Sequence, residues 1–552
     1  MAWLSCPTPN PSIRGNKQMS DRAPLAAVLA FSCLALPAPL TFAQTLEEAR
    51  FDRLTVALDA DPVGLEPALH FHAPGKMVLQ HVGEALVAHR DDMSIAPMLA
   101  ESIEISEDRR RYSFTIREGA KFHNGRPVTA DDVVWAWKEY YLEPEADWDC
   151  RVYYDGSGSI EERTVGGYIE SIDARDRRTV EFLLHEPSNL FLARMADVSC
   201  APIIFHRASL NTDGSWDRLI ATGPYEFVRW DKGDEIVLKR FRGYVPRPEP
   251  RDGYSGAKLA YADEIVFEIF DDRQAAIAAL KSGNVDIVPD IQESERVWLE
   301  GNDGIDIHST STINFWNLLI QASDPLLSDV RMRRAIAHAI DLDYLAAVLT
   351  EGRQEANPSV ISRNSLFHSD VHNRGHEFDL DRSRQLLKEA GYGGEPVTIQ
   401  TNRDGYPEMY RIGVLVRSML RGAGINAVLE IIPWQEQLDT HYRNGTFQLQ
   451  AFGQGGRNHP ALVYGKFIGP KDEMARFQWD DQQAFELVGK AQTAPTKAAQ
   501  QAIYDELHRR MLDEVPTLAL LNFEYHDATR SDLRGFHTTP FMRTTFWGVT
   551  RQ

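Results

Sequence analysis

Helical and strand patterns alternate along almost the whole chain, and no low-complexity linker or internal repeat interrupts them. Leu54–Leu58 and Tyr112–Arg117 alternate as strands do, whereas 271–283, 329–340 and 378–391 carry apolar residues at helical spacing. Such alternation is typical of an α/β fold with short connections. A chain of 552 residues is too long for one core, so we expect at least two lobes. Because no flexible tether separates them, we expect crossing strands that act as a hinge.

Residues that cap helices mark the ends of several predicted elements. Thr129 and Asp132 have the spacing of a capping box, and Asp329 is a good N-cap for another helix. Gly283 and Gly391 suit the position that follows a helix end. Further predicted elements are the strands Val397–Gln400 and Asn426–Ile432 and the helix Tyr410–Ala423.

The chain is strongly acidic, with 80 Asp and Glu residues against 59 Lys and Arg residues and a formal net charge of −21. A surface of this sign repels nucleic acid and anionic membranes, so neither is expected as the main partner. The simplest interpretation of the acidity is that it keeps the protein soluble.

The first 43 residues have the organisation of a secretory signal peptide with extra residues in front. Residues 1–18 are polar and rich in proline, and either Met1 or Met19 could be the true start. Leu25–Leu40 is an apolar run that is too short, and too broken by proline, to anchor the chain in a membrane. Thr41–Ala43 then has the small-x-small pattern of a cleavage site.

Two cysteines remain after such a leader is removed. Cys6 and Cys33 fall within the leader, and Cys150 and Cys200 lie in the mature chain. Cys33 raises the possibility of a lipid anchor, although the residues around it fit that pattern poorly. Two cysteines in an oxidising compartment suggest one disulfide, and two separate buried thiols are the alternative. The chain has no CxxC pair, so no redox or zinc role is expected.

Motifs of catalysis are missing from the sequence. We find no GxxxxGK[ST], no GxGxxG after a strand, no HExxH and no GxSxG. The sequence therefore predicts no catalytic residue, no cofactor and no metal site. His368, His372 and His376 lie four residues apart, but Asn373 and Gly375 are poor helix formers. We interpret this stretch as an exposed loop rather than as a metal site.

A glycine-rich loop at Phe452–His459 is the strongest candidate for contact with a ligand. Glycines let the backbone approach a ligand closely, and Arg and Asn side chains offer oriented hydrogen bonds. The polar side chains of this loop are Gln454, Arg457, Asn458 and His459. Aromatic residues at Phe315–Trp316 and Trp434 could form stacking walls, although aromatic side chains mostly fill cores.

Five segments in a fixed order resemble a known family. They are FTIREGAKFHNGRPVTADDV, ATGPYEFVRWDKGDEIVLKR, AAIAALKSGNVDIV, SDVRMRRAIAHAID and FDLDRSRQLLKEAGY. The chain resembles, from about Leu54 to about Phe536, the family 5 extracellular solute-binding proteins of bacterial ABC transporters, of the dipeptide- and oligopeptide-binding type.

The resemblance implies the fold of a large class II periplasmic binding protein. This is a two-lobed α/β clamp with an inserted subdomain, two crossing strands and a ligand between the lobes. The expected segments are a signal peptide at 1–43, lobe I at 44–95, 222–308 and 516–552, an inserted subdomain of lobe I at 96–221, and lobe II at 309–515. The crossing strands are expected near Ser311–Leu319 and Thr517–Tyr525.

The resemblance also implies a function. A monomeric periplasmic receptor would capture a small solute, such as a peptide, an opine or another polar compound, and deliver it to permease subunits at the inner membrane. Relatives also carry nickel chelates and sugars, so the fold does not identify the ligand. A secreted hydrolase with an interlobe active site is one alternative, and a secreted chaperone or sensor subunit is another.

One position departs from the peptide-binding members of the family. They commonly carry an Asp in the glycine-rich loop, which pairs with the α-amino group of the peptide, and Gly456 stands approximately at that place. Arg457 suggests an anionic or strongly polar ligand group instead. The other expected ligand contacts are His70, Phe71 and His72 from lobe I, and Trp316, Asn317 and Trp434 from lobe II.

Overall fold

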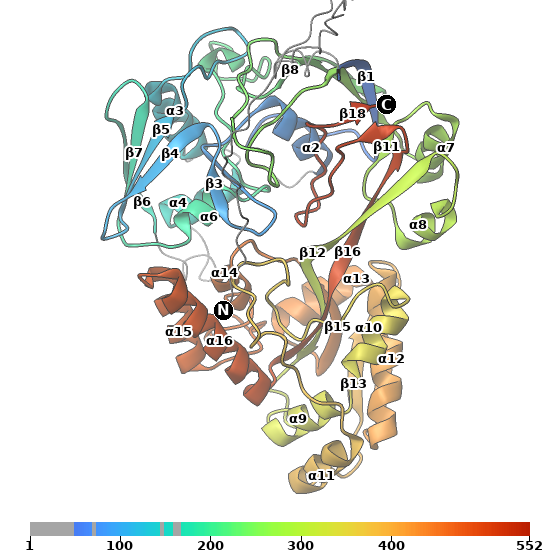
Figure 1. Cartoon of the computed structure of the whole chain (residues 1–552). Coiled ribbons are helices and arrows are strands. Elements are labelled where there is room, and N and C mark those ends of the chain that lie inside the picture. The colour runs from blue at the N-terminus through green and yellow to red at the C-terminus, as the bar shows by residue number, and fades with distance from the viewer. Residues whose placement is uncertain (1–48, 69–72, 144–147, 158–166) are drawn as a thin grey trace, which may run out of the picture. The chain divides into compact units, whose positions relative to one another are not determined.

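The computed structural model describes residues 49–68, 73–143, 148–157 and 167–552 (Figure 1). The predicted leader at 1–43, the proposed lipid site at Cys33 and the expected ligand contacts His70, Phe71 and His72 lie outside these residues. Within the described ranges, every helix is too short or too polar to span a bilayer.

Among the described residues, ten strands form the largest sheet. Their order across the sheet is β14 (Ala427–Ile431), β13 (Val397–Thr401), β15 (Leu449–Gln454), β12 (Ile305–Ile320), β16 (Thr517–Arg530), β11 (Ile287–Val288), β1 (Phe51–Leu58), β10 (Ala262–Ile269), β9 (Glu235–Arg240) and β8 (Tyr225–Asp231). Parallel and antiparallel pairs both occur, so the sheet is mixed, as in many α/β proteins.

The two long strands at the centre of this sheet join its halves. β12 and β16 lie side by side and antiparallel, from the pair Ile305–Arg530 to the pair Leu319–Thr517 (Figure 1). β16 pairs with β11 near one end of this ladder, and β12 pairs with β15 near the other. The prediction of two crossing strands is therefore confirmed. The regular pairing of the two strands is interrupted between Ser311 and Phe315.

A smaller sheet and an aromatic core form a separate layer. The sheet has the order β4 (Ala100–Ile105), β5 (Arg111–Ile116), β7 (Thr179–Leu184) and β6 (Ile169–Ala174). Helix α3 (Ala130–Ala136) packs against it and continues as a π-helical turn at Trp137–Tyr141. The predicted capping box is present, because Asp132 accepts hydrogen bonds from the Thr129 hydroxyl at 2.6 Å and from its amide at 2.9 Å. Trp137 and Tyr141 are fully buried.

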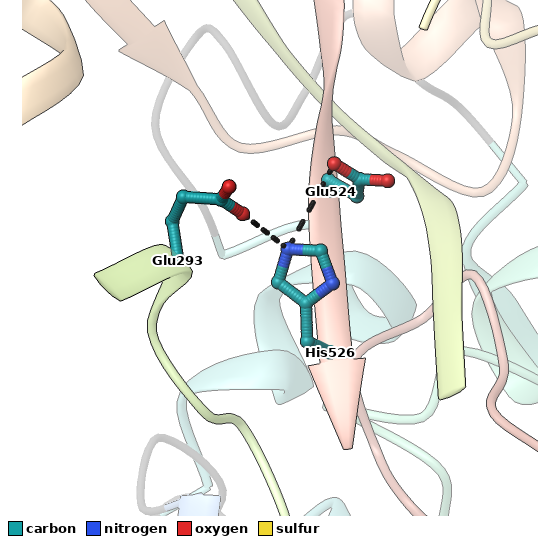
Figure 2. Close-up of side chains that lie close together, drawn as sticks. All are labelled: Glu293, Glu524 and His526. Carbon is teal, nitrogen blue, oxygen red and sulfur yellow. Dashed lines mark ion pairs between the residues drawn. The ribbon is translucent and has the colours of Figure 1, made fainter. Parts of the chain in front are cut away.

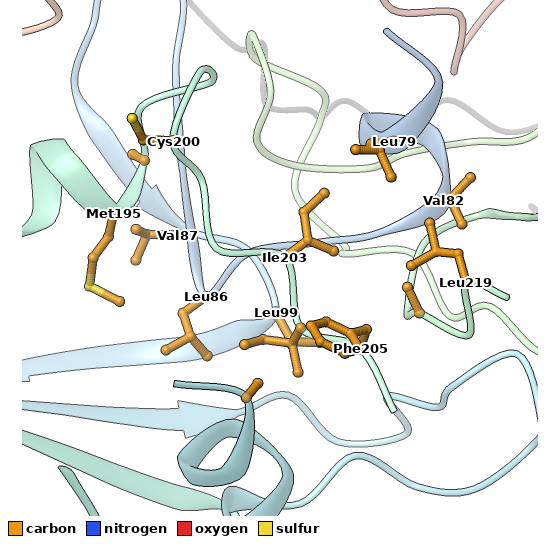
Figure 3. Packing of buried hydrophobic residues seen from close by; sticks show 14 of the residues in the cluster. Leu79, Val82, Leu86, Val87, Leu99, Met195, Cys200, Ile203, Phe205 and Leu219 are labelled. Carbon is orange, nitrogen blue, oxygen red and sulfur yellow. The ribbon is translucent and has the colours of Figure 1, made fainter. Parts of the chain in front are cut away.

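The buried residues beside this layer include both cysteines of a disulfide. Cys150 and Cys200 are bonded, with their Cα atoms 5.8 Å apart, which is the pairing expected for the two mature cysteines. Figure 3 shows Cys200 in the same hydrophobic cluster as Val87, Met195 and Ile203. The covalent bond thus holds the segments 149–155 and 194–200 together.

Several helices begin and end at the capping residues that the sequence indicates. As predicted, Asp329 caps α9 (Val330–His338) by accepting a hydrogen bond from a backbone amide of the first turn, and Asp272 caps α7 (Arg273–Ser282) in the same way. Gly283 ends α7 with φ 80°, a conformation that favours glycine. The remaining described helices and short strands have the bounds α2 (Ala73–Val82), α4 (Val152–Asp155), α6 (Phe191–Met195), α7 (Arg273–Ser282), α8 (Glu293–Leu299), α9 (Val330–His338), α10 (Leu342–Thr350), α11 (Leu380–Ala390), α12 (Pro407–Ala423), α13 (Trp434–Glu436), α14 (Pro460–Tyr464), α15 (Gln482–Thr493), α16 (Lys497–Glu514), β2 (Val87–His89), β3 (Ile95–Pro97), β17 (Leu533–Arg534) and β18 (Thr550–Arg551), with short turns at Asp149–Arg151, Arg207–Ser209 and Gln437–Tyr442.

Buried side chains form separate cores that meet at the crossing strands. One cluster includes Leu54, Phe114 and Ile265 and covers the β1 and β5 regions. The end of β12 contributes residues to two other hydrophobic clusters, because successive residues of a strand point to opposite faces of the sheet. Leu318 belongs to the cluster beneath α9 and α12, whereas Leu319 belongs to the cluster beneath α14 and α16.

Candidate functional site

A cavity of about 430 Å³ lies where the crossing strands lose their regular pairing. Its volume falls in the range of small-molecule sites. Five segments line it: the strand interruption at 313–314, the glycine-rich loop with α14 at 455–466, the two disulfide-linked segments 149–153 and 194–200, and the C-terminal loop 541–543. Residues far apart in the sequence therefore converge on one space.

The glycine-rich loop packs directly on the interrupted part of β12. The amide of Gly456 donates a hydrogen bond of 2.8 Å to the side-chain oxygen of Asn314. A Cβ atom added to Gly456 would lie 2.1 Å from the carbonyl oxygen of Ile313, which is far inside van der Waals contact. No side chain fits at position 456 in this backbone arrangement, so an amine-pairing Asp is excluded there on steric grounds.

Two cationic side chains reach the cavity from this part of the chain. Arg457 donates from Nη1 to the carbonyl of Gly456 at 3.1 Å, and Lys466 donates from Nζ to the carbonyl of Gly455 at 2.6 Å. Burial and the neighbouring charge of Arg457 lower the pKa of Lys466 well below its usual value. Sequence reasoning singled out Arg457 but missed Lys466, which follows α14 rather than lying in the loop.

Asn458 connects the loop to elements on the far side of the crossing strands. Its Nδ2 donates to the carbonyl of Ala193 in α6 at 2.7 Å and lies 2.8 Å from Nε2 of His89 in β2. Asn458 also lines the cavity, and it is 5% exposed. Asn458, a predicted ligand contact, therefore both lines the cavity and links the glycine-rich loop to α6 and β2.

His459 is placed at the start of α14. Its Nδ1 accepts from the amide of Ala461, and its ring packs on Phe367 and Tyr504. Burial, followed by the nearby His89, lowers its pKa to about 3, so the ring is neutral at ordinary pH. His459 is absent from the lining of the 430 Å³ cavity.

Four other predicted contacts lie outside that lining as well. Trp316 stacks on Phe523 at a centroid distance of 3.9 Å and packs in the core beneath α12. Asn317 is fully buried and donates to the hydroxyl of Thr517 at 3.1 Å. Trp434 and Gln454 pack beside Phe452 and Tyr442 respectively. Of the predicted contacts, Arg457 and Asn458 therefore line the cavity. The four residues described in this paragraph pack within the protein instead.

The C-terminal loop adds a strained residue and a further cation. Met542 has φ 56°, in the left-handed region that costs non-glycine residues conformational energy. Its sulfur accepts from Nδ2 of Asn314 at 2.9 Å, and Arg543 donates from Nη1 to its carbonyl at 2.9 Å. This loop lies some 85 residues beyond Arg457, which is why no local motif predicted it.

The disulfide-linked segments contribute both signs of charge. Asp149, Asp197 and Arg194 line the cavity from this side. Asp197 accepts a hydrogen bond of 2.9 Å from the amide of Ser199, and Arg194 donates to the carbonyl of Tyr153 and lies over its ring. This wall is therefore mixed in charge.

A second cluster of charged groups lies beside the crossing strands, away from the cavity. Figure 2 shows Glu293 of α8 with Glu524 and His526 of β16. In the part of the chain that the structure describes, it is the one trio of His, Cys, Asp or Glu whose ligand atoms all lie within 4.8 Å of one another. Nε2 of His526 is 3.2 Å from Glu293 and 3.8 Å from Glu524.

Arginines already occupy the carboxylates of this cluster. Arg353 reaches Glu293 at 2.7 Å and Glu524 at 3.2 Å, and Arg296 forms a fork on Glu293 with two bonds of 3.0 Å. A metal ion would have to displace or face two guanidinium groups, which is unfavourable. We therefore interpret the cluster as an ion-pair network, which we call the hinge network, that ties α8, β16 and the segment after α10 together.

The histidine-rich stretch is a loop, as predicted, and it is exposed at Asp370, 373–375 and 377–378, but not throughout. His372 has no exposed surface, and its ring lies tilted against that of His508 of α16 at a centroid distance of 5.0 Å. The hydroxyl of Ser369 donates to Asp505 of the same helix at 2.8 Å. The helix α16 covers this loop, which the sequence of the loop alone could not indicate.

Comparisons with known proteins agree with this architecture. The family profile of bacterial extracellular solute-binding proteins, family 5 Middle, matches residues 94–472. A probable peptide ABC transporter periplasmic-binding protein of Sinorhizobium fredii is 25% identical over 448 residues, which are 77% of this chain and 80% of that protein. The dipeptide-binding protein of Escherichia coli is 22% identical over 484 residues, which are 83% and 86% of the two chains. The structure of HbpA2 from Haemophilus parasuis has a TM-score of 0.75 at 21% identity and covers 91% of this chain and 100% of its own.

Proposed function

The chain belongs to the bacterial extracellular solute-binding proteins of family 5, and on that premise we propose that it is the solute-binding component of an ABC importer. It captures a small solute in the 430 Å³ cavity and delivers it to permease subunits at the inner membrane. The family consists of solute-binding proteins rather than enzymes, so the hydrolase alternative is set aside.

The observation that carries this proposal is the position of the cavity. Its lining comes from both ends of the β12–β16 crossing: from 455–466 after β15, and from 194–200 and 541–543 beyond the other end. A solute in this space contacts both groups of elements, so it favours the arrangement in which they approach. A receptor that releases its cargo to a permease needs such a reversible enclosure.

Peptides and peptide-like polar compounds, opines included, are the proposed class of solute. The two relatives named above are described as binding peptides, which supports this class. A free α-amino group cannot pair with a carboxylate at position 456, because that position accepts only glycine. Receptors for nickel chelates or sugar conjugates share the fold and are the second candidate within the proposal.

We place the mature protein in the periplasm as a monomer, after removal of the segment 1–43. The apolar run and the small-x-small pattern in the sequence support a cleavable leader. N-terminal sequencing of the secreted protein tests this placement, and the expected first residue is Gln44.

Ligand-dependent stabilisation and compaction test the receptor role. Dipeptides, tripeptides, opines, sugars and metal chelates are screened by thermal unfolding, since a solute at a hundred times its dissociation constant adds about 2.7 kcal/mol to stability. Small-angle scattering with a stabilising solute should give a smaller radius of gyration. Failure of every solute class to stabilise the protein would contradict the receptor role.

A further inference from the structure

The lining of the cavity is richer in positive charge than the protein as a whole. The full chain carries a net charge of −21, yet the cavity is lined by four cationic side chains, Arg194, Arg457, Lys466 and Arg543, and by two acidic ones, Asp149 and Asp197. A cationic recess in an acidic protein attracts anions and repels cations. The positive charge of the lining therefore favours an anionic solute.

Three of these cations lack a carboxylate partner. In the described part of the chain, no Asp or Glu lies within ion-pairing distance of Arg457, Lys466 or Arg543, and these side chains donate hydrogen bonds to main-chain carbonyls. The Nε atom of Arg543 is buried without any hydrogen-bond partner. Arg457, Lys466 and Arg543 are each half-buried, and charges that are partly withdrawn from water without partners are costly, so the arrangement favours an anion.

Two of the cationic groups are close together. A Cβ atom on Gly455 would stand 3.9 Å from Nη1 of Arg457 and 3.9 Å from Nζ of Lys466, so both groups lie on the same side of this glycine. Lys466 is half-buried in the wall of the cavity, and the charge of Arg457 adds to the effect of burial in lowering its pKa. One carboxylate or phosphate between them would accept hydrogen bonds from both.

The third cation approaches from another segment. Arg543 follows Met542, whose backbone is in the left-handed region. The sulfur of Met542 accepts a hydrogen bond from Asn314, which also lines the cavity. The charge of Arg543 acts on Lys76, Tyr254 and Asp290, all outside the glycine-rich loop. Arg543 is thus placed to meet a second group of the same ligand.

We infer that the cavity takes a small ligand with at least two anionic groups, one held by Arg457 and Lys466 and the other by Arg543. This inference rests on the proposed receptor function and narrows its solute to acidic compounds. Carboxylates and phosphates share the required chemistry, since both accept bidentate bonds from Arg. Acidic peptides and acidic opines fall in the first group, and phosphorylated compounds in the second.

Matched pairs of probes test the charge requirement. Glutamyl-glutamate is compared with glutaminyl-glutamine, and fructose 1,6-bisphosphate with fructose, by thermal unfolding and calorimetry. The acidic member of at least one pair should bind tenfold or more tightly than its neutral partner, and the pair that responds tells carboxylate from phosphate. Equal binding of both members, or no response to either acidic probe, would overturn the inference.

Proton uptake gives an independent measurement. An anion beside Lys466 should raise its lowered pKa again, so in a pH series binding should take up protons wherever Lys466 of the free protein is partly neutral, seen as a dependence of the calorimetric heat on the ionisation enthalpy of the buffer. Lys466→Met should remove this dependence. Heats that do not vary with the buffer in the wild-type protein would contradict a role for Lys466 in binding the anion.

Variants separate ligand contacts from structural supports. Lys466→Met and Arg543→Gln should each weaken binding of the acidic probe tenfold or more, whereas Lys388→Met, on the exposed face of α11, should leave it unchanged. Without ligand, Lys466→Met should melt at the same temperature as the wild type or higher, because an amine whose protonation is disfavoured by burial and by Arg457 is replaced by an apolar side chain. A lower melting temperature with normal affinity would show that Lys466 only braces Gly455 and would overturn its assignment.

The outcomes also distinguish this inference from the proposed function. If neutral or basic peptides bind and cause compaction while acidic probes do not, the inference fails and the receptor function stands. If neither acidic nor neutral solutes bind, both fail.

Discussion

Cationic side chains gather in two regions of the molecule, and their charges are balanced in different ways. In the hinge network, both arginines form short ion pairs with carboxylates of α8 and β16. At the cavity, Arg457, Lys466 and Arg543 are bonded to main-chain carbonyls alone. Of the two groups, only the first has its charges paired within the described chain.

We interpret the difference as one between charges that stabilise the fold and charges that await a ligand. A charge with its partners in place stabilises one arrangement of the elements that supply them. A charge without partners is held in place by the rest of the fold, and it gains stabilisation when a ligand brings the opposite charge. A cluster of ionisable residues is therefore a weak indication of a ligand site until the partners of each member are known.

The largest expected effect is on ligand affinity at the unpaired group. Arg457→Ala should weaken binding of the acidic probe by about 2–5 kcal/mol, because it leaves one anionic group of the ligand without its main partner. Calorimetry with glutamyl-glutamate measures this, and Arg443→Ala, at a 63% exposed arginine, is the control. Unchanged affinity in a folded Arg457→Ala protein would leave Arg457 as a brace for the carbonyl of Gly456.

Loss of the disulfide, which joins two segments of the cavity wall, should lower the stability of the protein. The double substitution Cys150→Ser and Cys200→Ser should reduce the free energy of unfolding by about 2–4 kcal/mol, since the bond closes a long loop. Urea unfolding measures the loss. Labelling of the denatured, unreduced wild-type protein should find no reactive thiol among the two mature cysteines, and two labelled thiols would rule the bond out.

In the hinge network, a substitution should lower the stability of the fold and leave the affinity for the ligand unchanged. Arg296, whose side chain is 7% exposed, forms charged hydrogen bonds to Glu293 and Glu300. Arg296→Met should cost about 1–3 kcal/mol of stability and leave the affinity for the acidic probe within twofold of the wild type. The control is Arg384→Met, at an exposed pair with Asp381. A large loss of affinity without a loss of stability would erase the distinction between the two regions.

A third group, the buried histidines, should respond to acid. Burial, followed by the charges of His508 and His368, lowers the pKa of His372 to about 3, against 6.5 in an unfolded chain. Since the unfolded state binds the proton more readily, stability should fall as the pH drops from about 6.5 toward 3, by about 1.4 kcal/mol per pH unit for this residue. Urea unfolding at pH 7 and pH 5 measures the slope, which should be shallower in His372→Gln. Equal slopes would show that His372 does not contribute.

Local signals explain what the sequence predicted well. Asp272 and Asp329 satisfy backbone amides within their own first turn, so helix starts follow from a few adjacent residues. The crossing strands lie near their predicted places, at Ile305–Ile320 and Thr517–Arg530, although both extend further. The lobe boundaries predicted with them have not been tested and stay a proposal.

The site was harder to predict because it depends on contacts between distant segments. Arg457 was identified from its loop, but Lys466 and Arg543 reach the cavity through the placement of α14 and of the C-terminal loop. Trp316 resembled a stacking wall, yet the alternation along β12 turns it toward Phe523 in the core. A residue type can suggest a contact with ligand, whereas the direction of its side chain requires the sheet.

The close contact between Gly456 and Ile313 has a consequence for the evolution of specificity. A carboxylate could return to position 456 only if the backbone of β12 moved at the same time, because the Cβ position lies 2.1 Å from the Ile313 carbonyl oxygen. One substitution cannot make that change without disturbing the strand that links the two halves of the sheet. On the proposed function, a change of solute would therefore arise more readily through substitutions at 457, 466 and 543 than through a side chain at position 456.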